Sequence, residues 1–273
     1  MDDPAPAVPK RHGRATAFGR HLRAWRRQRG ISQLELSLRA DVSQRHVSFI
    51  ETGRSRPRAE VVHRIAEALD VPLRERNALL AAAGLGPAYP EMPLAAEPIA
   101  PFREAIERLL VAHEPFPAIV VDRWWEVVAV NRAAARLLPL HGDGPRNALD
   151  LFLGPGSLRD SIDNFAEVAW TFLRRLRREA ADAGADTRLE ALLERAEALL
   201  RGVRPVDQGT GPDPGSDLVV CPRFVVDGQV VRTVSMVARF GSAREVTLDE
   251  LRVELVFPAD AAAEAFFRRA AEA

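Results

Sequence analysis

The chain has 273 residues, 47% of them hydrophobic, which is enough for one large or two modest domains with packed cores. Its single cysteine, Cys221, excludes an internal disulfide bond and is typical of a reducing cytoplasm. An apolar run of about 18 residues is missing and residues 1–10 lack a signal peptide's apolar core, so we expect a cytoplasmic protein without a membrane span.

The formal net charge is zero, but the charges are unevenly distributed along the chain. Residues 1–76 carry 16 basic and 9 acidic side chains, whereas the remaining residues carry 22 basic and 29 acidic ones. A basic first part joined to an acidic second part indicates a module that binds a polyanion, linked to a module that does not. Chance scatter of the charges is the alternative explanation.

Residues 1–15 are polar and contain prolines, which predicts a flexible tail. Helical periodicity and capping residues then predict five helices within residues 16–84, a compact all-α domain. The expected helices are 18–28, a second after Ser32, a third between Ser43 and Gly53, a fourth from Pro57, and 73–83.

The second and third expected helices form a helix-turn-helix, with the turn at Asp41 and Val42. Ser32 caps the second helix, and Glu35 three residues later completes a capping box. Ser43 caps the third helix in the same way. In this motif the later helix enters the major groove of DNA, so the third helix is the expected recognition helix.

Gln44 and Arg45 lie in the first turn of the expected recognition helix. Glutamine can pair with adenine and arginine with guanine in the major groove, so we expect both residues to contact bases. Phe49 falls on the same outward side, where it would contact thymine methyl groups or sugars. Partial packing of Phe49 is an equally good explanation.

Phosphate contacts are expected on both sides of the recognition helix. Gln33 begins the second helix, where its amide and the neighbouring backbone N–H groups can hold a phosphate. Ser48 lies on the outward side of the third helix, and Arg54 and Arg56 follow that helix in a loop. The alternative is that these are ordinary solvated polar residues.

Glu51 is an acid at the carboxyl end of a helix, where the helix dipole disfavours negative charge. It therefore needs a cation nearby. Arg26, late in the first helix, is the candidate, and we predict a partly buried Arg26–Glu51 pair that ties the first helix to the third.

Residues 85–100 contain four prolines, which predicts a semi-rigid linker. Residues 101–273 predict a helix, two strands, several helices, three strands and a last helix, hence a five-stranded antiparallel sheet with helices on one face and an α+β chain. The expected strands are 117–121, 124–130, 218–226, 229–240 and 245–257.

The second domain shows no catalytic pattern. The six histidines have no metal-ligand spacing, and Cys221 is expected to be a small core residue rather than a nucleophile. We therefore expect no enzyme, no metal and no cofactor. Trp124, Phe165 and Trp170 are the candidate lining of an apolar pocket. Packing of the hairpin explains Trp124 equally well, and packing in the core is the default explanation for Phe165 and Trp170.

Residues 18–84 resemble the Cro/C1-type helix-turn-helix family, also called the Xre family. The resemblance implies base contacts from Gln44, Arg45 and Phe49, phosphate contacts from Gln33, Ser43 and the loop of Arg54 and Arg56, and the Arg26–Glu51 pair. Asp41 departs from the glycine common in this turn, but aspartate tolerates the left-handed conformation. The residues that carry the resemblance are Leu22, Arg26, Ile31, Ser32, Gln33, Leu36, Val42, Ser43, Val47, Ser48, Ile50, Glu51, Gly53, Pro57, Ile65, Ala66, Leu69, Asp70 and Val71.

The second domain resembles the ligand-binding domain of MmyB-like transcription regulators. The similar segments are residues 115–125, 130–135, 235–241 and 251–260. This resemblance implies a PAS-like fold. It also implies a small apolar ligand, such as a fatty-acyl chain, held between the sheet and the helices.

Together these features predict a sequence-specific transcription regulator that binds double-stranded operator DNA as a homodimer. Its second domain would sense a small apolar molecule such as a fatty acid. In a competing hypothesis the second domain is only a scaffold for dimerisation or protein docking. An enzyme fused to a DNA-binding module is the weaker rival.

Overall fold

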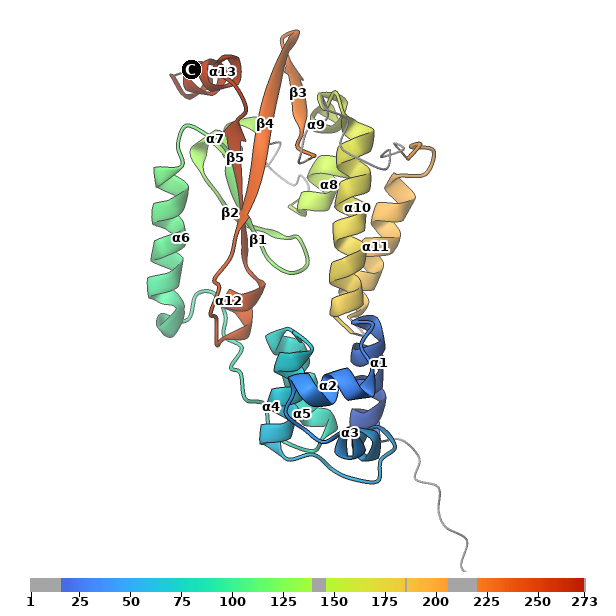
Figure 1. Ribbon diagram of the computed structural model, residues 1–273. Helices are drawn as coiled ribbons and strands as arrows, with labels where there is room; N and C mark the ends of the chain where they lie inside the picture. The colour runs from blue at the N-terminus through green and yellow to red at the C-terminus, as the bar shows by residue number, and fades with distance from the viewer. Residues whose placement is uncertain (1–15, 139–145, 185, 206–219, 273) are drawn as a thin grey trace, which may run out of the picture. The chain divides into compact units, whose positions relative to one another are not determined.

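The computed structural model describes residues 16–138, 146–184, 186–205 and 220–272 (Figure 1). The expected tail and most of the expected loop after Val203 lie outside these ranges. The chain divides into two compact units, Met1–Pro90 and Glu91–Ala273. The expected α+β class is confirmed, with five helices in the first unit and a five-stranded antiparallel sheet with helices in the second.

The first unit is a bundle of short helices around one apolar core. The helices are α1 (Ala17–Gln28), α2 (Gln33–Arg39), α3 (Gln44–Glu51), α4 (Ala59–Ala68) and α5 (Leu73–Ala82). Each contributes an apolar stripe with helical spacing, so that burial of these stripes holds the short helices together. The fully buried members include Phe18, Leu22, Leu36, Val47, Ile50, Val62, Ile65, Leu79 and Leu80.

A glycine allows α1 to cross α3 at close range. A Cβ atom on Gly19 would lie 2.7 Å from the Ile50 carbonyl oxygen and 2.8 Å from that of Glu51, closer than real Cβ contacts. Only glycine fits here without a shift of one helix. This close crossing brings the polar side of α1 against the end of α3.

The turn between α2 and α3 forms as expected at Asp41, whose φ of 50° lies in the left-handed region. The expectation for Pro57 is wrong. Helix α4 begins at Ala59 with Arg58 as its N-cap, and Pro57 lies before it, buried against the core. Burial of the proline ring, rather than its preference for a first helical turn, therefore decides its position.

The second unit is built on one curled sheet whose strands pair in the order β2-β1-β5-β4-β3, all antiparallel, and the expected PAS-like sheet is confirmed. A tight turn at Asp227 and Gly228, both with positive φ, joins β3 to β4. The strands are β1 (Ala118–Val121), β2 (Val127–Val130), β3 (Arg223–Val226), β4 (Gln229–Ala238) and β5 (Arg252–Pro258).

Helices cover both faces of this sheet, so the expectation of one covered face is wrong (Figure 1). Ala118 and Val120 pack with α6 (Ala100–Ala112), while Ile119 and Val121 pack with α8, α10 and α11 on the other face. The run Ala118–Val121 is apolar without alternation, the pattern of a strand buried on both sides. The other helical elements are η1 (Glu97–Ile99), α7 (Arg132–Leu137), α8 (Ala148–Leu153), α9 (Ser157–Asp160), α10 (Phe165–Asp182), α11 (Thr187–Leu199), α12 (Val246–Glu250) and α13 (Ala261–Glu272).

The strands begin later or end earlier than the sequence predicts, and for β5 and β2 a carboxylate accounts for the late start. The segment from Glu245 begins with helix α12, because the Glu245 carboxylate caps it by accepting from the Leu248 N–H at 2.8 Å. Strand β2 begins only at Val127, because the Asp122 side chain accepts from the backbone of Trp124 and Glu126 at 2.8 and 3.0 Å and holds a turn there.

The proline-rich segment is anchored at two places. The Asn77 side chain on α5 accepts from the N–H groups of Ala88 and Tyr89 at 3.0 and 3.1 Å and donates to the Tyr89 carbonyl at 2.7 Å. Farther along, the Met92 N–H donates to Glu245 at 2.7 Å and its carbonyl accepts from Thr247 at 2.8 Å. Each half of the segment therefore belongs to one of the two units.

Candidate DNA-binding face and ligand cavity

Helix α3 has an inward and an outward side. The Ser43 hydroxyl caps it, accepting from the His46 N–H at 3.2 Å, while Val47 and Ile50 are buried. Gln44 and Arg45 are exposed in the first turn. The cap and the buried pair therefore fix which way these two polar side chains face.

Phe49 lies half-buried on this outward side, between two cations. The guanidinium carbons of Arg45 and Arg54 lie 5.1 and 5.8 Å from the ring centre. The Phe49 carbonyl also accepts from the Arg54 N–H at 2.8 Å, which shapes the loop that follows α3. An apolar ring between two positive charges suits a surface that meets sugars, methyl groups and phosphates.

The Glu51 carboxylate, at the end of α3, accepts hydrogen bonds from several side chains. Glu51 is 1% exposed, and Arg26 donates to it through Nε at 2.7 Å and Nη2 at 3.3 Å. Arg26 also donates through Nη1 to the Ile31 carbonyl at 2.8 Å. Burial raises the pKa of Glu51, but the hydrogen bonds from Arg26 and the other donors around it outweigh burial and hold the pKa below its usual value.

Gln33 and Arg23 complete this cluster. The Gln33 Nε2 donates to Glu51 at 2.8 Å, so its amide is oriented by the carboxylate as well as being the expected phosphate contact. Arg23 donates to Glu51 at 3.4 Å and was missed from the sequence, although it precedes Arg26 by three residues and so shares its helix face.

The remaining expected phosphate contacts lie around α3. Arg54 and Arg56 are exposed in the loop after the helix, and Ser43 is exposed at its start. Ser48 is half-buried, one turn along from Ser43. These residues border the outward side of α3 that carries Gln44, which is the arrangement that phosphate contacts beside a reading helix require.

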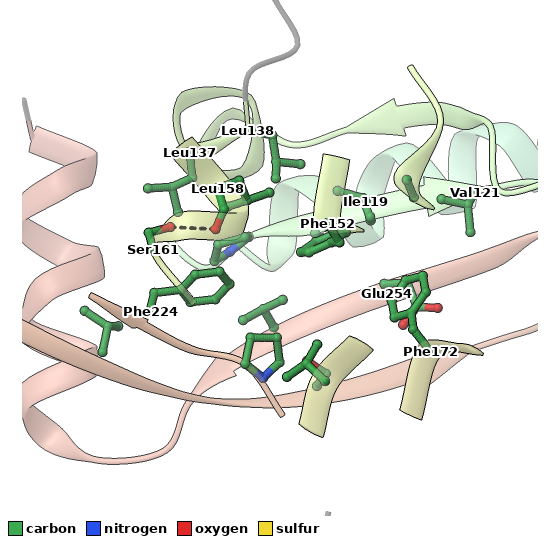
Figure 2. A pocket seen from close by; sticks show the side chains of 18 of the residues that line it. Ile119, Val121, Leu137, Leu138, Phe152, Leu158, Ser161, Phe172, Phe224 and Glu254 are labelled. Carbon is green, nitrogen blue, oxygen red and sulfur yellow. Dashed lines mark hydrogen bonds between the residues drawn. The ribbon is translucent and has the colours of Figure 1, made fainter. Parts of the chain in front are cut away.

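The second unit contains an apolar cavity of about 330 Å³, at the lower end of the range for small-molecule sites (Figure 2). It lies between the sheet and α10, and α8, α9 and α13 also contribute side chains. The described lining residues are Pro117, Ala118, Ile119, Val121, Trp125, Leu137, Leu138, Ala148, Phe152, Leu158, Ser161, Val168, Thr171, Phe172, Arg175, Val220, Pro222, Phe224, Val226, Val231, Ser235, Val237, Glu254, Val256, Phe266 and Phe267.

The aromatic residues expected to line the pocket do not do so. Trp124 lies instead beside Arg188, 4.2 Å from its guanidinium, and donates through Nε1 to Asp186 at 3.2 Å. Phe165 lies beneath the Arg159 guanidinium at 4.4 Å, and Trp170 packs against the core from outside the cavity. The assignment of these three residues to the lining is wrong.

Their neighbours line the cavity instead. On α10 the lining residues Val168, Thr171, Phe172 and Arg175 share one helix face, whereas Trp170 follows Val168 by two residues and points away. Trp125 lines the cavity in place of Trp124, and its backbone has a φ of 64°, in the left-handed region.

One end of the cavity wall is charged. Arg175 Nη1 lies 2.8 Å from Glu254 Oε1, and Arg175 Nε donates to Glu179 at 3.1 Å. Glu179 also accepts from Trp125 Nε1 at 2.8 Å and from Arg252. Burial lowers the pKa of Arg175, but Glu254 and Glu179 outweigh burial, so its pKa is raised and it stays charged.

Cys221 lies beside the cavity rather than in a reactive site. It is 6% exposed, and its Sγ accepts from the Ser235 N–H at 3.2 Å. Its chain neighbours Val220 and Pro222 line the cavity. In the described part of the chain, no group of three or more His, Cys, Asp or Glu side chains is placed to hold a metal, and no helix is long and apolar enough to cross a membrane.

Two family models match this chain. The model of the MmyB-like transcription regulator ligand binding domain matches residues 102–270, and a helix-turn-helix model matches residues 22–76. No curated protein matches. A solved structure described as an RNA-binding Light-Oxygen-Voltage receptor is 14% identical, covering 93% of this chain and 60% of that one, and its TM-score of 0.24 is too low to carry an argument.

Proposed function

Because the chain belongs to the family of MmyB-like transcription regulators with a ligand-binding domain, we propose that it reads an operator through α3 and senses an apolar molecule in its cavity. That it is a DNA-binding transcription regulator with a ligand-binding domain follows from the two family matches. The finer assignments below are supported by the outward face of α3 and by the apolar cavity.

We assign the base contacts to Gln44, Arg45 and Phe49, which share the outward side of α3. A single recognition helix reads only a few base pairs, so a homodimer on a near-palindromic operator is the arrangement that gives enough specificity. We assign the phosphate contacts to Gln33, Ser43, Ser48, Arg54 and Arg56.

Two substitutions test the assignment of base contacts and phosphate contacts to different residues. Gln44→Ala should relax the base preference at one operator position, by about 1–3 kcal/mol of discrimination. Arg54→Ala should weaken binding to every sequence alike and reduce the slope of log affinity against log salt by about 0.9. Affinities for an operator and its single-base variants, measured at several salt concentrations, separate the two effects. Equal loss of specificity from both substitutions would contradict the assignment.

The second unit is proposed to hold an apolar chain such as that of a fatty acid. The single observation that carries this proposal is the cavity of about 330 Å³ with an almost wholly apolar lining. A cavity with a mostly apolar lining favours an apolar molecule over water along that lining. To change DNA affinity, the molecule must bind the two states of the regulator differently, typically by about 1–3 kcal/mol.

Native mass spectrometry of the purified protein, followed by denaturing extraction, tests the ligand. A co-purifying apolar molecule is expected in the wild type and should be lost in Val168→Trp, which fills the cavity from α10. Arg178→Trp is the matched control, because Arg178 is exposed on the same helix. A wild-type protein that is empty and binds neither added fatty acids nor neutral long-chain amphiphiles would favour a scaffold role for this unit.

A further inference from the structure

The charged end of the cavity limits the kind of head group that a ligand can carry. Among the described residues that line the cavity, Arg175 and Glu254 are the only charged ones. Their charges cancel, and Figure 2 shows Glu254 on the side of the cavity away from Leu137 and Ser161. The cavity therefore offers a ligand one polar end with no net charge.

The guanidinium of Arg175 is already neutralised. Two carboxylates contact it, those of Glu254 at 2.8 Å and Glu179 at 3.1 Å. Trp125 lies against it with the ring centre 4.8 Å away, and the Arg252 guanidinium lies 5.0 Å from the same ring. Arg175 is thus fixed by packing and by charge, and it has no unbalanced positive charge to give to an anion.

A free ligand carboxylate would be disfavoured at this end. It would lie beside Glu254 and become the third carboxylate in a cluster whose two arginines, Arg175 and Arg252, are already balanced by Glu254 and Glu179. Like charges at short range in poorly screened surroundings oppose each other strongly, as paired active-site carboxylates show by keeping a proton. Removing the ligand carboxylate from water adds a further cost.

A neutral head group meets no such penalty. Glu254 Oε1 is buried and lies 2.8 Å from Arg175 Nη1. A carboxylate oxygen has two lone pairs, so it can accept a hydrogen bond from a ligand besides its contact with Arg175. A hydroxyl or a primary amide can donate to this oxygen and also accept from the remaining N–H groups of Arg175. At the other side of the cavity the Ser161 hydroxyl already donates to the Leu158 carbonyl at 2.8 Å.

We infer that the cavity selects amphiphiles with an apolar chain and a neutral hydrogen-bonding head, such as a long-chain alcohol or primary amide, over free fatty-acid anions. This inference rests on the proposed function of the cavity as a ligand site. It assigns Glu254 as the residue that sets the selectivity and Arg175 as its positioning partner.

The test compares three probes that share one chain and differ in the head: dodecanol, dodecanamide and dodecanoate. Their affinities for the full chain are measured by titration calorimetry, below micelle concentrations and well above the carboxyl pKa. Dodecanol and dodecanamide should bind at least about tenfold more tightly than dodecanoate. Dodecanoate binding as tightly as dodecanol in the wild type would overturn the inference.

Glu254→Gln provides the decisive variant. It keeps the shape of the side chain but leaves one positive charge without its cavity partner, so dodecanoate affinity should rise about tenfold while dodecanol affinity changes little. Glu194→Gln, the same chemical change at an exposed position on α11, should leave all three affinities unchanged. An unaltered preference in folded Glu254→Gln, checked by circular dichroism, would overturn the assignment. Binding of none of the probes to the wild type would instead overturn the proposed ligand site, and the inference with it.

Discussion

Each unit contains an arginine–glutamate pair, buried at Glu51 and partly buried at Glu254, and the two pairs have different surroundings. Glu51 receives hydrogen bonds from Arg26, Arg23 and Gln33 inside a helical bundle. Glu254 contacts Arg175 and faces a cavity. A carboxylate that is fully bonded holds helices in place, whereas one that keeps an open acceptor beside a cavity can respond to what enters.

Among the substitutions that test this contrast, the largest loss of stability is expected in the first unit. Arg26→Ala leaves Glu51 buried with weaker partners and should destabilise the unit by about 3–5 kcal/mol. Hydrogen exchange in the full chain, followed on peptides from α1 and α3, measures the loss in this unit alone. Arg39→Ala is the control, since its pair with Glu35 is half exposed and worth less than about 1 kcal/mol. Wild-type protection in Arg26→Ala would refute the structural role.

Lowering the pH should also destabilise the first unit through Glu51, because the pKa of this carboxylate is lowered in the folded state. Its folded pKa lies below its unfolded value, so it contributes stability above the unfolded pKa and loses it as the pH falls through the folded pKa. Protection of α1 and α3 should therefore fall on acidification in the wild type and fall less steeply in Glu51→Gln. Glu35→Gln, at a half-exposed position, should keep the wild-type slope. Parallel slopes for Glu51→Gln and wild type would contradict this account.

Glu254→Gln should cost the second unit no more than about 2 kcal/mol, since Arg175 keeps its bond to Glu179 at 3.1 Å. Protection of peptides from β5 and α10 measures this cost. A loss as large as that of Arg26→Ala in its own unit would show that the cavity pair is a structural pair as well, and the contrast between the two glutamates would disappear.

The smallest effect is expected at Asp122. Burial raises the pKa of Asp122 despite the hydrogen bonds that its carboxylate accepts from the backbone of Glu126 and Trp124, so the ionised form costs stability in the folded state. Asp122→Asn keeps the accepting oxygen and should lie within about 0.5 kcal/mol of wild type. Because the variant lacks the buried negative charge, its stability relative to wild type should increase as the pH rises from acid to neutral. An opposite pH trend, in thermal unfolding, would contradict the raised pKa.

The contrast between the units also explains what the sequence predicts. In the first unit the signals are local: Ser32 and Ser43 each cap a helix through the N–H three residues later, and Gly53 ends α3 with a φ of 74°. Such relations span a few residues and can be read directly. The helices there consequently begin and end within a few residues of their expected positions.

In the second unit the contacts that determine the structure join residues far apart in the sequence, or involve residues that are not typical of their role. The cavity lining is drawn from residues 117 to 267, so no short spacing marks it. Trp125, whose backbone φ is positive, lines the cavity in place of Trp124, and α12 is a five-residue helix capped by a glutamate instead of the usual serine, threonine or aspartate. The five strands could still be predicted because each carries its own apolar run, but their order in the sheet, β2-β1-β5-β4-β3, could not.

The buried cysteine beside the cavity has a practical consequence. Since Cys221 is the only thiol in the chain and is 6% exposed, a thiol reagent reaches it only when the wall around it opens. The rate at which Cys221 of the unmodified protein reacts with the reagent therefore measures how often that wall opens. A molecule that fills the cavity and reduces this opening would slow the reaction of Cys221. The native chain therefore reports whether the cavity is occupied without any added label.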